Sequence, residues 1–252
     1  MSNELRIAIE AAKIGAKTAL KYYEKKMLVS IKKDKTVVTE ADFQTEDAIR
    51  SFILSRIPNA KFLAEETGGD KEEETFWIID PIDGTRCFTR NIPFWCILIS
   101  LYKKGEVMLG VCYFPLLHNG LMYAERGKGA HRGLKKIYTS NISDLSKCYL
   151  TFGSLRHFKN KKPLLKLVDI VGSVRGYEPT YGHFLLSCGS IDATIDVYAQ
   201  PWDSAPFKVI IEEAGGRITH IDGKPWDIFG RGFIGTNGLL HDEAIHILNK
   251  KI

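Results

Sequence analysis

The chain has 252 residues, of which 44% are hydrophobic and 26% charged; this is ordinary usage for a folded globular protein and excludes a disordered, collagen-like or low-complexity chain. Its net charge of +5 comes from 35 Lys and Arg against 30 Asp and Glu, but the basic residues are scattered, so we expect no nucleic-acid partner. Apolar runs are shorter than the ~20 residues of a membrane span and the N-terminus reads as no export signal, so we expect a cytoplasmic protein with no membrane partner.

Five cysteines are widely spaced, with no C-x-x-C pair and no histidine at the spacing of a zinc site. They are Cys87, Cys96, Cys112, Cys148 and Cys188. An odd number of separated cysteines is typical of reduced thiols in the cytoplasm, so we expect neither a disulfide framework nor a zinc site.

The N-terminal segment predicts two helices. Apolar residues recur every three or four positions over residues 5–23, which is the stripe of an amphipathic helix. Thr39 is a typical N-cap for a second helix from 41 to about 57, with Asp42 in its first turn. On this helix we expect an inward face made of Phe43, Ala48, Ile49, Phe52 and Ile53.

Short apolar runs in the next segment predict a sheet. The predicted strands cover residues 62–64, 77–79, 96–102, 107–114 and 121–124, and 96–102 with 107–114 forms a hairpin. The glycine-rich segment 127–133 lacks the G-x-G-x-x-G spacing, so we interpret it as a turn between strands rather than as a phosphate-binding loop.

A second set of elements follows the polar stretch 139–147. It comprises a strand near Tyr149, helices over 163–171, 182–188 and 204–214, and strands over 193–197, 217–219 and 232–235. The sequence therefore predicts mixed α and β structure in two parts, with a seam near residue 140.

The most informative segment is an apolar strand that ends in two carboxylates, Trp77-Ile-Ile-Asp80-Pro-Ile-Asp83-Gly84-Thr85. Carboxylates at the end of a strand, beside a glycine that lets another backbone approach, suit hard cations and phosphate. A turn with capping aspartates would explain Asp83 and Gly84, but it would leave Asp80 without a partner directly after a buried strand.

The spacing of the two aspartates separates two kinds of phosphatase chemistry. Enzymes that form an aspartyl phosphate place two aspartates at i and i+2, on one face of a strand. Here the pair is i and i+3, and a bend at Pro81 can aim Asp80, the Ile82 carbonyl and Asp83 at one centre. The amides of Gly84 and Thr85 would then meet a phosphate at a helix start. This pattern favours attack by a metal-activated water over a covalent intermediate.

Three further motifs make a family resemblance specific. The chain resembles the inositol monophosphatase family in four motifs: the segment from Asp80 to Thr85, Ala64-Glu65-Glu66-Thr67, Pro201-Trp-Asp203-Ser-Ala and Glu213-Ala-Gly-Gly216. The motifs occur in the same order as in the family, and the resemblance extends from about Leu5 to the C-terminus. The resemblance implies an α+β fold: a layered α/β/α/β/α sandwich of the inositol monophosphatase and fructose-1,6-bisphosphatase (sugar phosphatase) type. Residues 1–140 would carry most metal ligands and residues 141–252 would complete one continuous catalytic unit.

The resemblance also implies the roles of individual residues. Two or three Mg²⁺ ions would be held by Glu65, Asp80, Asp83, Asp203 and the Ile82 carbonyl. The catalytic residues would be Thr85, Asp42 and Glu65, with Thr85 and Asp42 orienting the attacking water, and the substrate would contact Asp83, Gly84, Thr85, Asp196 and Asp203. Lys32 and Lys33 are either phosphate contacts or ordinary surface residues. Without the resemblance, Asp42 would be taken for an ordinary first-turn residue.

The expected substrate is a small polar phosphate monoester, histidinol phosphate or inositol monophosphate. Arg86 and the segments 92–96, 154–157 and 174–177 are more similar to the histidinol-phosphate phosphatase branch, but Glu178-Pro179 stands where that branch carries Gly-Asp. Fructose-1,6-bisphosphatase or nucleotide-derived phosphatase activity is the alternative, and a metal-binding regulatory scaffold is the alternative without catalysis. The resemblance further implies a homodimer and inhibition by lithium.

Overall fold

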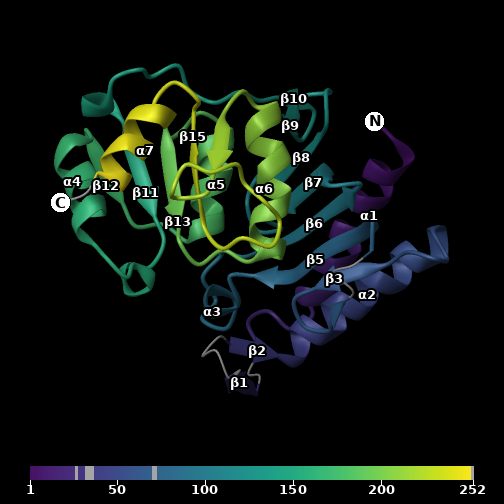
Figure 1. Ribbon diagram of the computed structural model, residues 1–252. Helices are drawn as coiled ribbons and strands as arrows, with labels where there is room; N and C mark the ends of the chain where they lie inside the picture. The colour runs from purple at the N-terminus through teal and green to yellow at the C-terminus, as the bar shows by residue number, and fades with distance from the viewer. Residues whose placement is uncertain (26–27, 32–36, 70–72, 251–252) are drawn as a thin grey trace.

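The computed structural model describes residues 1–25, 28–31, 37–69 and 73–250 (Figure 1). Lys32 and Lys33 lie outside the described residues. None of the described helices combines the length and the apolar character that a membrane crossing requires. Each of the five cysteines is a free thiol.

The larger sheet has eight strands in the order β10-β9-β8-β7-β6-β5-β3-β4 among the described residues. They are β3 (Phe62–Ala64), β4 (Gly68–Gly69), β5 (Thr75–Asp83), β6 (Cys96–Lys103), β7 (Glu106–Tyr113), β8 (Leu121–Glu125), β9 (Ala130–Arg132) and β10 (Lys135–Lys136). Only β3 and β5 run parallel; the other neighbouring strands of this sheet are antiparallel. The five strands predicted in this region, including the hairpin, are confirmed.

The smaller sheet has the order β12-β11-β13-β15-β14 among the described residues. Its strands are β11 (Tyr149–Phe152), β12 (Ser173–Arg175), β13 (Ala193–Asp196), β14 (Arg217–Thr219) and β15 (Phe233–Thr236). A separate two-stranded ribbon pairs β1 (Val29–Ile31) with β2 (Val37–Thr39). The predictions did not include β12 or this ribbon, since both are too short to show an alternating pattern.

The helices form layers on and between the two large sheets (Figure 1). They are α1 (Asn3–Ala19), α2 (Glu40–Arg56), α3 (Thr85–Phe88), α4 (Lys162–Ile170), α5 (Pro179–Ser187), α6 (Pro201–Glu213) and α7 (His241–Asn249), with 3₁₀ turns at Leu145–Lys147 and Leu155–His157. Helices α1 and α2 cover the outer face of the larger sheet, α5 and α6 lie between the sheets, and α4 and α7 cover the smaller sheet. This α/β/α/β/α layering confirms the predicted fold class.

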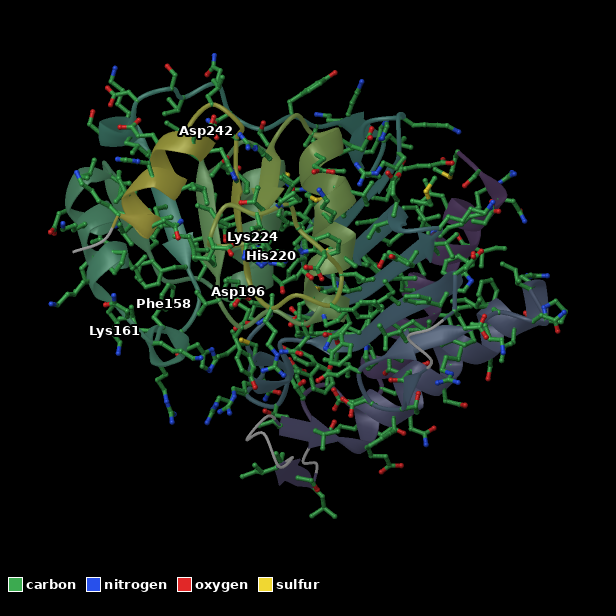
Figure 2. The ribbon with its side chains drawn as sticks, in the orientation of Figure 1. Phe158, Lys161, Asp196, His220, Lys224 and Asp242 are labelled. Carbon is green, nitrogen blue, oxygen red and sulfur yellow. The ribbon has the colours of Figure 1, made fainter. Side chains whose placement is uncertain are left out.

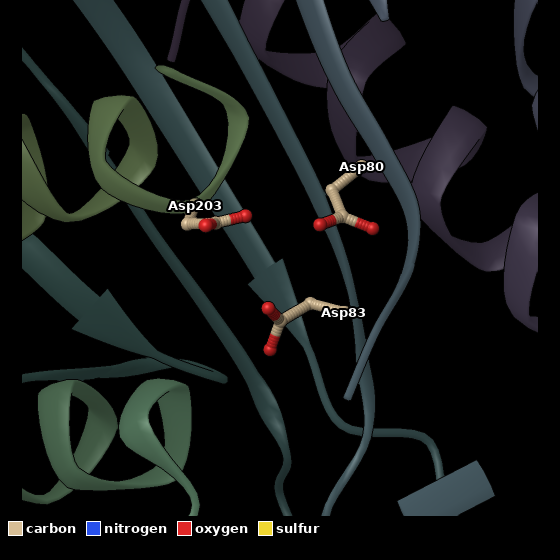
Figure 3. Close-up of side chains that lie close together, drawn as sticks. All are labelled: Asp80, Asp83 and Asp203. Atoms are coloured by element: carbon tan, nitrogen blue, oxygen red, sulfur yellow. The ribbon is translucent and has the colours of Figure 1, made fainter. Parts of the chain in front are cut away.

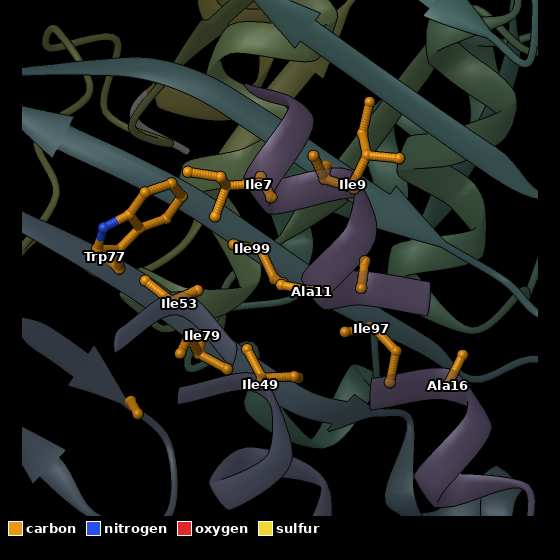
Figure 4. Close-up of a cluster of buried hydrophobic side chains, with 14 of the residues drawn as sticks. Ile7, Ile9, Ala11, Ala16, Ile49, Ile53, Trp77, Ile79, Ile97 and Ile99 are labelled. Atoms are coloured by element: carbon orange, nitrogen blue, oxygen red, sulfur yellow. The ribbon is translucent and has the colours of Figure 1, made fainter. Parts of the chain in front are cut away.

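The larger sheet is buried on both faces because helices cover both. Side chains alternate along β5, so Trp77 and Ile79 pack against α1 and α2, whereas Phe76 and Ile78 face the core between the sheets. Figure 4 shows Trp77 and Ile79 among the isoleucines of the first of these cores. A strand buried on two sides reads as a continuous apolar run, which is why residues 77–79 could be predicted as a strand.

The predicted inward face of α2 is wrong in part. Phe43 is 47% exposed, and Ala48 and Phe52 are only partly buried. The buried face follows Asp42, Thr45, Glu46, Ile49 and Ile53 instead. Three of these five residues are polar, so hydrophobicity did not reveal the face that packs inward.

Helices α5 and α6 both begin earlier than predicted. Helix α5 starts at Pro179 rather than Gly182, and α6 at Pro201 rather than Ser204. Proline suits the first turn of a helix because its fixed φ is helical and its missing N–H has no partner to lose. The earlier start of α6 places Asp203 in the first helical turn. Helix α7 was not predicted.

A close approach fixes α6 against the larger sheet. A Cβ at Gly110 in β7 would lie 2.4 Å from the Pro206 carbonyl oxygen, so only glycine allows this packing. The glycine-rich segment 127–133 lies nearby, and the prediction of a turn there is right only in part: residues 127–129 lead from β8 into β9, and residues 130–132 are β9 itself. Its Gly127 and Gly129 amides each donate to the Glu213 carboxylate at 2.7 Å.

Candidate metal and phosphate site

A bulge near the end of β5 brings two aspartates to the same side of the sheet. Asp80 pairs with Leu98 of β6 and Asp83 with Cys96, so β5 carries one extra residue over this stretch. Side chains at i and i+3 of a regular strand would point to opposite faces, and one inserted residue reverses this. Pro81 belongs in such a bulge because it has no N–H for the ladder. The bend predicted from Pro81 is confirmed.

Asp203 completes a group of three carboxylates with Asp80 and Asp83. One oxygen from each lies within 4.8 Å of the others, and Figure 3 shows the three side chains facing one another, two from β5 and one from α6. Asp203 Oδ2 also accepts the Gln200 N–H at 2.9 Å, which caps α6 and fixes the carboxylate. Residues more than a hundred positions apart thus form one acidic centre.

Burial and mutual repulsion raise the pKa values of all three carboxylates. The pKa of Asp80 is raised well above its usual range by burial and then by the charges of Glu65, Asp83 and Asp203. Burial and Asp203 do the same to the pKa of Asp83. For Asp203, burial raises the pKa to about 8, although the Gln200 N–H opposes the shift. A set of oxygen donors this short of positive charge fits a hard divalent cation such as Mg²⁺.

Glu65 and Ile82, the other expected metal ligands, lie at the same centre. Glu65 follows β3, its N–H donates to the Ile79 carbonyl at 3.1 Å, and its charge raises the pKa values of Asp80 and Asp203. It is not one of the three closest carboxylates. The Ile82 carbonyl accepts the Thr85 hydroxyl at 3.1 Å. A carbonyl oxygen has a second lone pair, so this bond leaves room for a cation.

The structure brings together Thr85 and Asp42. The Thr85 hydroxyl lies 3.4 Å from Asp42 Oδ1, and Asp42 is completely buried. Asp42 Oδ2 accepts the N–H and the hydroxyl of Thr39, at 2.8 and 2.7 Å. The same carboxylate therefore caps α2 and faces Thr85 from a fixed position.

Gly84 connects β5 to the single turn of α3. Its φ is +82°, and a Cβ there would lie 2.8 Å from the Phe94 carbonyl oxygen. Any other residue would be strained in this conformation and would also clash. Gly84 thus turns the chain so that Thr85 begins α3.

A cavity of about 1130 Å³ extends from the acidic centre to the ends of the smaller sheet's strands. It is lined by Glu65, Asp80, Asp83, Thr85, Arg86, Arg156, His157, Tyr177, Glu178, Asp196, Tyr198, Trp202, Asp203 and Arg231, among others. All the residues proposed from the family resemblance as metal ligands or substrate contacts line it; Asp42, proposed as catalytic, is buried behind Thr85, and Lys32 and Lys33 lie outside the described residues. The volume suits a small polar molecule.

Asp196 lies at the end of β13, on the smaller sheet's side of this cavity (Figure 2). It is 8% exposed, and burial raises its pKa although the Tyr198 N–H donates to it at 2.9 Å. The His157 ring lies against the Tyr198 ring in a tilted arrangement, with ring centroids 4.3 Å apart. The far end of the cavity therefore combines a buried carboxylate with an aromatic surface.

Sequence reasoning assigned no role to Glu178, which also lines the cavity. The Cys87 thiol donates to Glu178 Oε2 at 3.5 Å. Burial and repulsion by Asp196 raise the pKa of Glu178, while the Cys87 hydrogen bond and Arg86 lower it. The available signal was an acidic residue directly before the proline that starts α5.

A known protein family and a known enzyme match nearly the whole chain. A model of the inositol monophosphatase family matches residues 1–252. The chain is 34% identical over 249 residues to the histidinol-phosphatase of Chlorobaculum parvum. The matched region covers 95% of this chain and 94% of that protein.

Two solved structures are similar over nearly the full length. Thermotoga maritima IMPase matches with a TM-score of 0.90 and 30% identity, covering 98% of this chain and 97% of that one. An IMPase/NADP phosphatase complexed with Mg²⁺ and phosphate matches with a TM-score of 0.85 and 25% identity. That match covers 98% of this chain and 95% of the other. The similarity therefore extends over nearly the whole chain in both cases.

Proposed function

Because the chain belongs to the inositol monophosphatase family and is a phosphatase, we propose that it is a Mg²⁺-dependent phosphomonoesterase that acts on a small polar phosphate. Histidinol phosphate is the first candidate substrate and inositol monophosphate the second. The observation that carries the proposal is the convergence of Asp80, Asp83 and Asp203. We further propose two or three Mg²⁺ ions per chain and a homodimer, as the family resemblance implies.

The metal ligands would be Asp80, Asp83, Asp203, Glu65 and the Ile82 carbonyl. Their raised pKa values support this assignment, because buried carboxylates that repel one another are stabilised by a cation between them. When bound, Mg²⁺ supplies the positive charge that activates a water and polarises a phosphate. The remaining chemistry depends on how the protein's own side chains orient the water and the substrate.

Thr85 would orient the attacking water. Its hydroxyl has two acceptors, the Ile82 carbonyl and Asp42, so its proton is used within the protein. The Thr85 oxygen then has lone pairs free and can accept a hydrogen bond from the water, which orients it. Asp42 cannot turn away because Thr39 holds its other oxygen. Water rather than an aspartate would attack, with the phosphate aligned along the Gly84 turn.

The far end of the cavity supports an amino alcohol as the leaving group. Glu178 and Asp196 are two carboxylates that raise each other's energy when both are charged. A substrate ammonium group between them would remove this repulsion and form charge-assisted hydrogen bonds. The His157 and Tyr198 rings offer a surface for a flat heterocycle. Histidinol phosphate carries both groups, whereas inositol phosphate carries neither.

Asp196→Ala is expected to change substrate preference more than metal affinity. The side chain lies at the substrate end of the cavity and is not one of the three converging carboxylates. We expect kcat/KM for histidinol phosphate to fall more than that for inositol 1-phosphate, with an unchanged Mg²⁺ dependence. Equal losses on all substrates would show that Asp196 is structural or a metal ligand.

Glu178→Gln is expected to lower kcat/KM for histidinol phosphate about tenfold, the cost of losing one charge-assisted contact. Gln has nearly the shape of Glu but no charge, so inositol 1-phosphate should be hydrolysed within about twofold of wild type. Glu106→Gln, an exposed position at the start of β7, is the matched control. A similar loss on both substrates would contradict a role in recognising a cation.

A substrate panel tests the proposed function. Phosphate release is measured from histidinol phosphate, inositol 1-phosphate and fructose 1,6-bisphosphate, with Mg²⁺ and with EDTA. We expect release only with Mg²⁺ and the highest kcat/KM for histidinol phosphate. Preference for inositol 1-phosphate would overturn the substrate assignment but keep the reaction class. No release from any substrate with Mg²⁺ would favour a metal-binding scaffold.

A further inference from the structure

Helix α2 carries two completely buried carboxylates on one face, one turn apart: Asp42 and Glu46. Asp42 faces Thr85 and has a place in the proposed reaction. Glu46 does not line the cavity, and the proposed reaction does not use it. A carboxylate buried in a helix interface is costly unless its oxygens are well bonded, so its partners indicate what it does.

Both oxygens of Glu46 bind the turn that follows β3. Oε2 accepts the Glu66 N–H at 2.9 Å, and Oε1 accepts the Thr67 hydroxyl. Arg50, one turn further along α2, donates to Thr67 and lies 3.5 Å from Glu46 Oε1. Arg50 therefore offsets the buried charge while holding the same turn.

This turn contains Glu65, which is held from two sides. On one side its N–H donates to the Ile79 carbonyl of β5 at 3.1 Å. On the other side the next peptide N–H, that of Glu66, is bound by Glu46. The backbone on both sides of the Glu65 side chain is therefore tied to an element that carries another part of the site: β5 with Asp80, and α2 with Asp42.

We propose that Glu46 is a positioning residue for the metal site: by binding the Glu66 amide it holds the Glu65 carboxylate toward Asp80. The proposal rests on the proposed function insofar as Glu65 is a metal ligand. Metal ligands must be held to within about 0.5 Å, and loss of a residue that orients a ligand typically costs about 10–100-fold in metal affinity or activity. Helix α2 would then set the distance between the metal ligand Glu65 and the water-orienting Thr85.

Glu46→Gln tests the proposal with little change of shape. The amide has one acceptor where the carboxylate has two, so its NH₂ group must face either the Glu66 N–H or Thr67, where Arg50 already donates. We expect the Mg²⁺ dissociation constant, measured by calorimetry, to rise about 10–100-fold. Asp47→Asn, the exposed neighbour on the same helix, makes the same charge change and should stay within about twofold of wild type.

A double-mutant cycle shows whether Glu46 acts through Glu65. In a Glu65→Gln background, Glu46→Gln should raise the dissociation constant by less than about twofold, because the ligand it positions has been weakened already. A purely structural role would lower the melting temperature and leave metal affinity unchanged. Wild-type affinity in folded Glu46→Gln, or an equal loss in both backgrounds, would overturn the proposal.

Thr67→Val keeps the test decisive if Glu46→Gln does not fold. It removes the Thr67 hydrogen bond that fixes one oxygen of Glu46, so the carboxylate is held less firmly against the Glu66 N–H. We expect a smaller rise in the Mg²⁺ dissociation constant in the same direction, and an unchanged value would overturn the proposal. If Glu65→Gln alone binds Mg²⁺ like wild type, the ligand set in the proposed function fails instead.

Discussion

Asp203→Asn is expected to lower turnover by several orders of magnitude while the protein stays folded. Asp203 is the one converging carboxylate that comes from α6, so its loss removes the ligand opposite Asp80 and Asp83. Removing a charged ligand weakens both the binding of the cation and the stabilisation of the leaving oxygen. The Asn side-chain oxygen can still accept the Gln200 N–H, so the start of α6 should remain capped.

Turnover and folding must be measured on the same samples. Circular dichroism and melting temperature establish that the variant is folded, and phosphate release at saturating Mg²⁺ gives kcat. Asp169→Asn, an exposed aspartate of α4, is the control for the charge change and should retain wild-type turnover. Wild-type rates in folded Asp203→Asn would refute the assignment of the site.

The metal-free protein is expected to lose stability as the pH rises from 6.5 to 8, and Mg²⁺ is expected to restore it. The pKa of Asp203 is raised from 3.8 to about 8, and the pKa values of Asp80 and Asp83 are also raised. A carboxyl group whose pKa is higher in the folded state binds more protons when folded. Its contribution to the stability of the fold is complete below the pKa of the unfolded state, near 4, and is lost as the pH rises to about 8.

The range from pH 6.5 to 8 is chosen because two histidines change the stability in the opposite direction at lower pH. Burial lowers the pKa of His183 to about 3 and that of His241 to about 4, so both destabilise the fold as the pH falls below 6.5. Their pKa in the unfolded state is near 6.5, so most of this opposing effect is already complete above that pH. Urea unfolding in the presence of EDTA gives the free energy of unfolding at each pH, and Asp203→Asn should make it less dependent on pH. A flat wild-type profile, or no effect of Mg²⁺, would contradict the account.

The catalytic end of the site could be predicted because its residues are close in sequence or occur in recognisable motifs. Asp80 and Asp83 follow a buried strand, and the proline between them marks the bulge that turns both to one side. Thr39 marks the start of α2 and with it the position of Asp42. That Asp42 would meet Thr85 followed only from the family resemblance, because the two are 43 residues apart.

The supporting residues could not be predicted because their partners are tertiary. Glu46 is one polar residue among several on α2, and its burial depends on an amide twenty positions away. The same polar face explains the error at Phe43, which is exposed while charged neighbours are buried. In the sequence, Glu178 stood out only because the histidinol-phosphate phosphatase branch carries Gly-Asp where this chain has Glu178-Pro179. Its place in the cavity depends on how α5 packs between the sheets.

The central claim is that Asp80, Asp83, Asp203 and Glu65 form one cage for hard cations. Anomalous diffraction from crystals soaked in Mn²⁺, a substitute for Mg²⁺, tests it directly. The account predicts manganese peaks about 2.0–2.2 Å from oxygens of these carboxylates, and their loss or weakening in Asp203→Asn. Crystals of protein that is active with Mn²⁺ but shows no peak among these carboxylates would contradict it.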